Sequence, residues 1–105
     1  MEIKFDKKYL EELFCDGKTT DKKHRFQPKI IVKYRKTVDT LESVSCVEDL
    51  FRYNALRYEK LKGDKDGLES VRVNDQYRIE FETSKVVSTT VVTICNIVEL
   101  SNHYK

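Results

Sequence analysis

The spacing of apolar residues changes along the chain, from helical in the first half to alternating in the second. Residues 1–5 alternate and predict a short edge strand. Three apolar residues then recur at helical spacing: Leu10, Leu13 and Phe14. They predict a helix with Asp6 as its N-cap and Gly17 at its end, because glycine adopts the left-handed backbone that ends many helices.

A second helix is predicted at residues 28–43, after a polar and basic connector, because Pro28 is tolerated in the first turn of a helix. The apolar residues of this segment fall on one side of a helical wheel: Ile30, Ile31, Tyr34, Val38 and Leu41. Lys29, Lys33 and Lys36 fall on the opposite side and are called the lysine ridge below. This ridge is either an ordinary solvated face or, beside the cations of the connector, a contact surface for a polyanion.

From residue 57 onward, apolar residues alternate with polar ones and predict strands. The predicted strands lie at residues 58–62, 68–73, 77–82 and 90–100. Val86 and Val87 are expected in a loop between the last two strands. Helices followed by consecutive strands favour an α+β domain with an antiparallel sheet, and 105 residues fit one such domain, residues 1–105.

The hairpin at residues 71–79 indicates its own register. With a three-residue loop at residues 74–76, the apolar residues of the hairpin share one face, and with a two-residue loop they do not. The three-residue loop pairs Arg72 with Arg78 on the other face, together with Ser70 and Glu80. Paired like charges repel, so this face is either a lattice of arginine and glutamate or a place where two guanidinium groups receive a phosphate.

Further candidate residues lie just outside the hairpin. Tyr58, Lys60 and Lys62 alternate onto one face of the preceding strand. If that strand lies beside the hairpin, the lysines join the two arginines, and Tyr58 is either a buried ring or a platform on which an unpaired base stacks. Of the two histidines, His24 in the connector is expected in solvent, and His103 follows the last strand. Histidine is the side chain best suited to proton transfer at neutral pH.

Composition narrows the classes of protein. The chain has 20 Lys+Arg and 18 Asp+Glu for a net charge of +2, yet residues 18–36 hold eight of the basic residues against Asp21 alone. No apolar run approaches the roughly 18 residues of a membrane span, and the N-terminus lacks the apolar core of a signal peptide. Cys15, Cys46 and Cys95 form no Cys-x-x-Cys pair and are interpreted as small buried residues of a cytoplasmic protein.

One block of the sequence resembles a known family. Its motifs are Leu61-Lys62-Gly63-Asp64, Gly67, Ser70-Val71-x-Val73 and Gln76-Tyr77-Arg78-Ile79-x-Phe81. This block resembles the signature of HigB toxins, which belong to the RelE/ParE superfamily of toxin–antitoxin systems. Residues 7–17 are similar to the first helix of those toxins, so the resemblance runs over most of the chain.

The resemblance implies a RelE-like fold, with N-terminal helices packed on one face of a small, mostly antiparallel sheet. It also implies cleavage of mRNA in the ribosomal A site and inhibition by a HigA-like helix-turn-helix antitoxin. With a ribosomal target, the basic stretch that contains the lysine ridge is the surface expected to face 16S rRNA. The lysine and arginine of the family's active surface correspond to Lys62 and Arg78. The family often ends in Asp-Tyr-His, with the histidine taken as catalytic, and only His103 matches that motif here.

Metal-free cleavage of RNA uses the ribose 2′-OH as nucleophile and needs a base, an acid and cations that stabilise the charge on the phosphate. No carboxylates cluster with metal-ligand spacing, so neither a metal nor another cofactor is expected. The predicted roles are charge stabilisation for Arg78 and Arg72, the same role or that of base for Lys62, and that of acid for His103, with Tyr104 and Glu59 in reserve. Two alternatives stay open, a ParE-like toxin that inhibits gyrase and a catalytically inactive module that binds RNA or protein.

Overall fold

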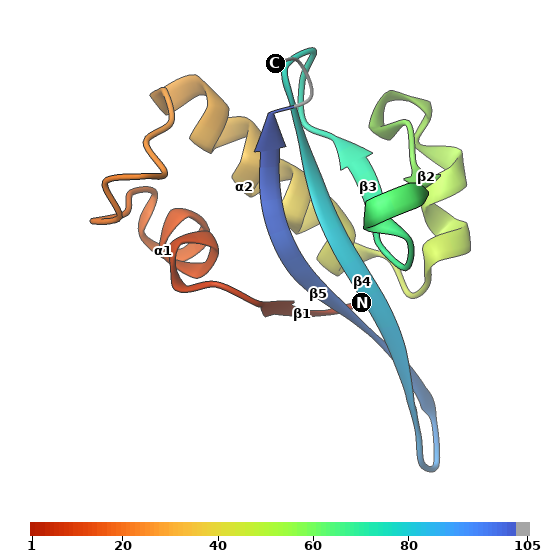
Figure 1. Cartoon of the computed structure of the whole chain (residues 1–105). Helices are drawn as coiled ribbons and strands as arrows, with labels where there is room; N and C mark the ends of the chain where they lie inside the picture. The colour runs from red at the N-terminus through yellow and green to blue at the C-terminus, as the bar shows by residue number, and fades with distance from the viewer. Residues whose placement is uncertain (103–105) are drawn as a thin grey trace.

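The computed structural model describes residues 1–102 and shows an α+β fold, as predicted (Figure 1). The helices and strands are β1 (Glu2–Phe5), α1 (Lys8–Asp16), α2 (Pro28–Ser43), β2 (Glu59–Lys60), β3 (Glu69–Arg72), β4 (Tyr77–Val87) and β5 (Val91–Asn102). Short 3-10 helices lie at Val47–Arg52 (η1), Asn54–Leu56 (η2) and Gly63–Lys65 (η3). The five strands form one sheet in the order β1-β5-β4-β3-β2, in which only β1 runs parallel to its neighbour.

The two α-helices pack on one face of this sheet and enclose the core with it. Tyr34 and Val38 of α2 are fully buried in one cluster with Leu10 of α1 and with Val71 and Ile79 of the sheet. The Tyr34 hydroxyl donates a 2.8 Å hydrogen bond to the carbonyl of Leu10 and so ties the helices together. The predicted apolar stripe of α2 is therefore the side that faces the sheet.

The ends of α1 confirm one prediction and correct another. Gly17 ends the helix in left-handed backbone, with φ of 73°, and its N–H donates to the carbonyl of Leu13. The predicted N-cap is wrong by one residue, since Lys7 occupies that position without a capping side chain. The N–H of Asp6 instead donates a 2.8 Å hydrogen bond to the carbonyl of Ile97, which extends the pairing of β1 with β5.

The predicted register of the hairpin is confirmed. Arg72 pairs with Arg78, and Val71 pairs with Ile79. The Asn74 side chain holds the turn, since its Oδ1 accepts hydrogen bonds from the N–H groups of Gln76 at 2.9 Å and Tyr77 at 2.7 Å. The two arginines therefore lie on the face of the sheet opposite to the helices.

The expectation of a loop at Val86 and Val87 is wrong. β4 continues through both residues and pairs with β5 as far as Val87 opposite Val91, so the hairpin projects as a long arm (Figure 1). The arm has no core beneath it, and the Val87 side chain is 72% exposed. Cross-strand pairs of β-branched residues favour this extended structure without burial.

Two further observations concern the cysteines and membrane segments. Cys95 is buried as expected, whereas Cys15 is exposed, because it lies on the outer side of α1. Burial raises the pKa of the Cys95 thiol to about 12. Among residues 1–102, no helix is both long and apolar enough to cross a membrane.

Candidate functional site

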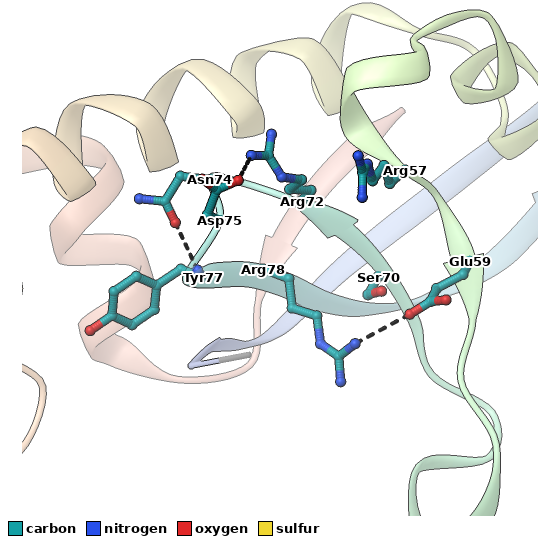
Figure 2. A pocket seen from close by; sticks show the side chains of 8 residues that line it. All are labelled: Arg57, Glu59, Ser70, Arg72, Asn74, Asp75, Tyr77 and Arg78. Atoms are coloured by element: carbon teal, nitrogen blue, oxygen red, sulfur yellow. Dashed lines mark hydrogen bonds and ion pairs between the residues drawn. The ribbon is translucent and has the colours of Figure 1, made fainter. Parts of the chain in front are cut away.

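Three arginines line one hollow of about 240 Å³ on the open face of the sheet (Figure 2). Arg72 lies on β3 and Arg78 on β4, and Arg57 is the residue that follows η2. The other lining residues are Glu59, Ser70, Asn74, Asp75 and Tyr77. Three cations around one concave surface create a positive potential that suits a phosphate.

The guanidinium of Arg78 is held by carboxylates on two sides. Its Nη1 donates a 3.2 Å hydrogen bond to Oε1 of Glu59 (Figure 2), and its Nε lies 3.6 Å from Oε2 of Glu80. The Glu80 side chain is only 3% exposed, and Nζ of Lys65 donates a 2.7 Å hydrogen bond to the same oxygen. Nε of Arg78 is buried and has no hydrogen-bond partner within residues 1–102. This network positions Arg78 before any ligand arrives.

Arg72 has a partner that a ligand can displace. It forms an ion pair with Asp75, whose side chain is 93% exposed. Exposed ion pairs of this kind contribute at most about 1 kcal/mol, so a phosphate competes with Asp75 at little cost. Arg57 adopts φ of 45°, the only positive φ of a residue other than glycine within residues 1–102. Such backbone costs energy for a side chain with a Cβ, and it often occurs at functional sites.

The expectation that Tyr58 and Lys60 lie beside the two arginines is wrong. In β2, Glu59 pairs with Ser70 and shares the arginine face, whereas Lys60 pairs with Glu69 on the helix face. The Tyr58 hydroxyl donates a 2.5 Å hydrogen bond to Oε1 of Glu69, and its ring packs against Phe51. Burial, followed by this hydrogen bond, raises the pKa of Tyr58. The alternation along the strand was predicted correctly, but the side of the sheet on which Tyr58 and Lys60 lie was predicted wrongly.

Lys62 and Lys65 differ in what they contact. Lys62 is exposed directly before η3, and it makes neither an ion pair nor a side-chain hydrogen bond within the described chain. Lys65 contacts Glu80 and so joins the Arg78 network, which the sequence reasoning missed. The signal that could have found Lys65 is its place in the middle of a loop between Gly63 and Gly67, close in sequence to Lys62.

The lysine ridge is separate from the arginine hollow. Lys29, Lys33 and Lys36 are exposed, as predicted, on the side of α2 that faces away from the core. Since α2 covers the opposite face of the sheet from Arg72 and Arg78, one flat surface cannot contact both groups. The remaining predicted residue, His103, lies outside the described residues.

A second hollow, of about 540 Å³, lies on the other side of Arg78. It is lined by His24, Lys65, Arg78, Glu99, Leu100, Ser101 and Asn102. The expectation that His24 is a solvated surface residue is wrong, because its side chain is 30% exposed and contacts two residues. Its ring stacks on Tyr9 with centroids 3.7 Å apart, and its Nδ1 lies 3.0 Å from Oδ2 of Asp21. Within residues 1–102, no group of three or more His, Cys, Asp or Glu is arranged to hold a metal ion.

The fold is that of RelE-type toxins. The chain matches the YoeB/ParE toxin from Agrobacterium tumefaciens with a TM-score of 0.55 at 18% identity, over 99% of this chain and 100% of that one. It matches the YoeB-YefM complex from Staphylococcus aureus with a TM-score of 0.52 at 21% identity, over 99% and 98% of the two chains.

The sequence narrows this class to one family. Residues 3–94 match the family model described as the RelE-like toxin of type II toxin–antitoxin system HigB. Toxin HigB-1 of Vibrio cholerae serotype O1 is 36% identical over 84 residues, which is 78% of this chain and 83% of that toxin. The chain therefore belongs to the HigB-like toxin family.

Proposed function

We propose that this protein is the toxin of a type II toxin–antitoxin system and that it inhibits translation by cutting mRNA on the ribosome. The observation that carries the proposal is the hollow lined by Arg57, Arg72 and Arg78. Arg78 is held in place by Glu59 and Glu80, and Arg72 is free to exchange an exposed partner for a phosphate. A scissile phosphate in this hollow would meet guanidinium groups from adjacent strands, which match phosphate oxygens with paired hydrogen bonds.

The proposed reaction uses the 2′-OH of the ribose as nucleophile against the neighbouring phosphorus. A base takes the 2′ proton, the P–O5′ bond breaks, and the products are a 2′,3′-cyclic phosphate and a 5′-OH. Arg78 and Arg72 stabilise the charge that grows on the non-bridging oxygens. Lys62 is proposed to assist them. Its exposed side chain directly precedes η3, and Lys65 of η3 contacts Glu80, the carboxylate beside Arg78.

Glu59 is the best-placed base among residues 1–102. Its carboxylate lies 3.2 Å from Nη1 of Arg78, so it stands beside the place proposed for the phosphate. The side chain is 57% exposed and lines the hollow, which leaves room for a ribose. In this scheme Glu59, held in reserve as an acid on sequence grounds, is the base. Lys62, predicted either to stabilise charge or to act as base, keeps the first of these two roles. The predicted acid, His103, stays a prediction.

Two partners follow from the proposal. The exposed lysine ridge is the proposed contact with rRNA, and the message is proposed to bind the opposite face of the molecule. A HigA-like helix-turn-helix antitoxin is the proposed inhibitor. In support, the chain that this protein resembles in fold was solved as part of a complex, YoeB-YefM. The cytoplasm, where ribosomes lie, is the proposed location, and no cofactor is required.

Inducible expression in bacteria tests this function, with primer extension on a reporter mRNA and on the same message without a start codon. The proposal expects cuts within the translated message, none in the untranslated one, and none with Arg78→Ala. Uncut message with DNA damage would favour a ParE-like gyrase inhibitor instead. Neither cuts nor DNA damage, with the protein folded, would favour an inactive binding module.

A further inference from the structure

The hollow beside β5 places His24, a side chain that can donate a proton, on the side of Arg78 away from Glu59, the proposed base. We infer that His24 is the acid that protonates the 5′ oxygen as it leaves, with Asp21 as its positioning residue. This inference rests on the proposed function and adds to it a residue from the connector between α1 and α2.

The first argument is the placement of the two groups on opposite sides of Arg78. Arg78 lies on the central strand β4, with Arg72 of β3 on one side and Ser101 of β5 on the other. The hollow on the β3 side contains Glu59, and the hollow on the β5 side contains His24. In an in-line displacement the nucleophile and the leaving group lie on opposite sides of the phosphorus. A phosphate held by Arg78 would therefore direct its 2′ oxygen toward one hollow and its 5′ oxygen toward the other.

The second argument is that the His24 ring is fixed in a geometry suited to proton donation. Nδ1 lies 3.0 Å from Oδ2 of Asp21, and the ring stacks on Tyr9 with an interplanar angle of 6°. The Tyr9 hydroxyl donates a 2.5 Å hydrogen bond to Glu99, which anchors Tyr9 to β5. Nε2 of His24 makes no hydrogen bond within the part of the chain that is described, so it is available to a substrate.

The groups around His24 carry both signs of charge. Asp21 is the nearest anion, and its hydrogen bond with His24 is the main cause of the lowered pKa of the Asp21 carboxyl. Glu99 lines the same hollow but is shared with Lys7 and Tyr9. Lys65 and Arg78 are the facing cations, and Lys65 is itself paired with Glu80. The carboxylate of Asp21 is thus the partner that fixes Nδ1 of the His24 ring in place.

The proton balance of the step is complete. Glu59 takes the 2′ proton while the 2′ oxygen forms a bond to phosphorus and the P–O5′ bond breaks. The proton on Nε2 of His24 passes to the 5′ oxygen, which leaves as a 5′-OH, and His24 becomes neutral. Exchange with water then restores the proton on His24 and removes the one on Glu59.

The test compares His24→Gln with wild type on programmed ribosomes, using normal mRNA and mRNA with a 5′-bridging sulfur at the cleavage site. A thiolate leaves without protonation, so the acid matters only for the normal substrate. One proton-transfer group contributes about 10²–10⁴-fold, so we expect His24→Gln to lose that factor on normal mRNA. We expect it to match wild type on the sulfur substrate. Asp21→Asn should show the same pattern with a smaller loss.

Dependence on pH gives a second readout. On normal mRNA, the wild-type rate should fall as rising pH deprotonates the acid, and His24→Gln should lack that fall. His103→Gln is the comparison, because His103 is the other histidine of the chain. If His103→Gln alone loses the factor and regains it on the sulfur substrate, the inference is overturned. The same holds if His24→Gln cuts normal mRNA at the wild-type rate, or is equally slow on both substrates. Wild-type protein that cuts neither mRNA would overturn the proposed function as well.

Discussion

Lys65 and Lys62 lie three residues apart, but only Lys65 of the two contacts Glu80, the carboxylate beside Arg78. Substituting each lysine in turn therefore tests the contacts that hold Arg78. Nζ of Lys65 lies 2.7 Å from Oε2 of the buried Glu80, whereas Lys62 has no ion pair within residues 1–102. Changing each lysine to methionine removes the charge and keeps a long unbranched side chain. The two variants therefore isolate the contribution of the Lys65–Glu80 contact.

The expected loss of stability in Lys65→Met follows from the burial of Glu80, whose side chain is 3% exposed. A hydrogen bond to a charged group contributes about 1.5–3 kcal/mol. Lys65 is 44% exposed, so solvent screens part of its attraction to Glu80. Once Lys65 is replaced, Arg78 at 3.6 Å is the only cation within residues 1–102 that is paired with the Glu80 carboxylate. We expect Lys65→Met to lower the free energy of unfolding by about 1–2 kcal/mol, and Lys62→Met to change it by less than about 0.5 kcal/mol.

Urea unfolding followed by circular dichroism measures both values, and cleavage on programmed ribosomes measures activity. Lys62→Met should slow cleavage without loss of stability, because Lys62 is proposed to contact the phosphate. Lys65→Met should lose stability and also slow cleavage, because Glu80 would then draw the Arg78 guanidinium toward itself. Equal stability losses for the two variants, or a larger loss for Lys62→Met, would refute the assigned network.

Three other predictions concern residues outside the hollow. Tyr58→Phe should lower the free energy of unfolding by about 1–2 kcal/mol, because Glu69 loses a hydrogen bond, and should leave cleavage unchanged. The exposed Tyr53→Phe is its control, and slower cleavage by Tyr58→Phe would contradict the assigned face. Folding raises the pKa of Cys95 from 9.0 to about 12, so above pH 9 the thiol ionises more readily in the unfolded chain than in the folded one. The stability that depends on the protonated thiol is therefore complete below pH 9 and is lost as pH rises toward 12. The buried Tyr34 shifts in the same direction, so the urea midpoint should fall between pH 8 and pH 11, and a constant midpoint would contradict this. Charge reversal of Lys29, Lys33 and Lys36 to glutamate should weaken co-sedimentation with ribosomes and leave the unfolding midpoint nearly unchanged, since all three are exposed. Unchanged co-sedimentation would exclude the lysine ridge as an rRNA contact.

The hairpin shows what a sequence pattern can predict. Burial of one face admits a single register, so the pairing of Arg72 with Arg78 follows from the alternation of apolar residues alone. The bounds of α2 follow equally well from Pro28 and its apolar stripe. In both elements, the core-facing residues repeat at the period of the backbone.

The errors arise where no buried face imposes a period. β2 has only two residues, so its sequence does not indicate whether Glu59 or Lys60 shares the arginine face. The end of the arm, where Val86 and Val87 pair with Val92 and Val91, stays extended without a core, so no alternation of buried residues marks it as a strand. His24 reaches the sheet from an irregular connector through contacts with Tyr9 and Asp21, and no local pattern reports such a contact.

Cleavage of mRNA on purified, programmed ribosomes tests the central claim most directly. The variants are Arg78→Ala, Arg78→Lys and the control Arg52→Ala. The Arg52 side chain is 77% exposed and, within residues 1–102, forms an ion pair only with Asp49. Arg78→Lys keeps a cation beside Glu80 but loses the paired donors of a guanidinium. The account predicts that wild type and Arg52→Ala cut the message to 5′-OH products, and that both Arg78 variants lose about 10²–10³-fold in rate while still folded. Cutting by folded Arg78→Ala at the wild-type rate would contradict it.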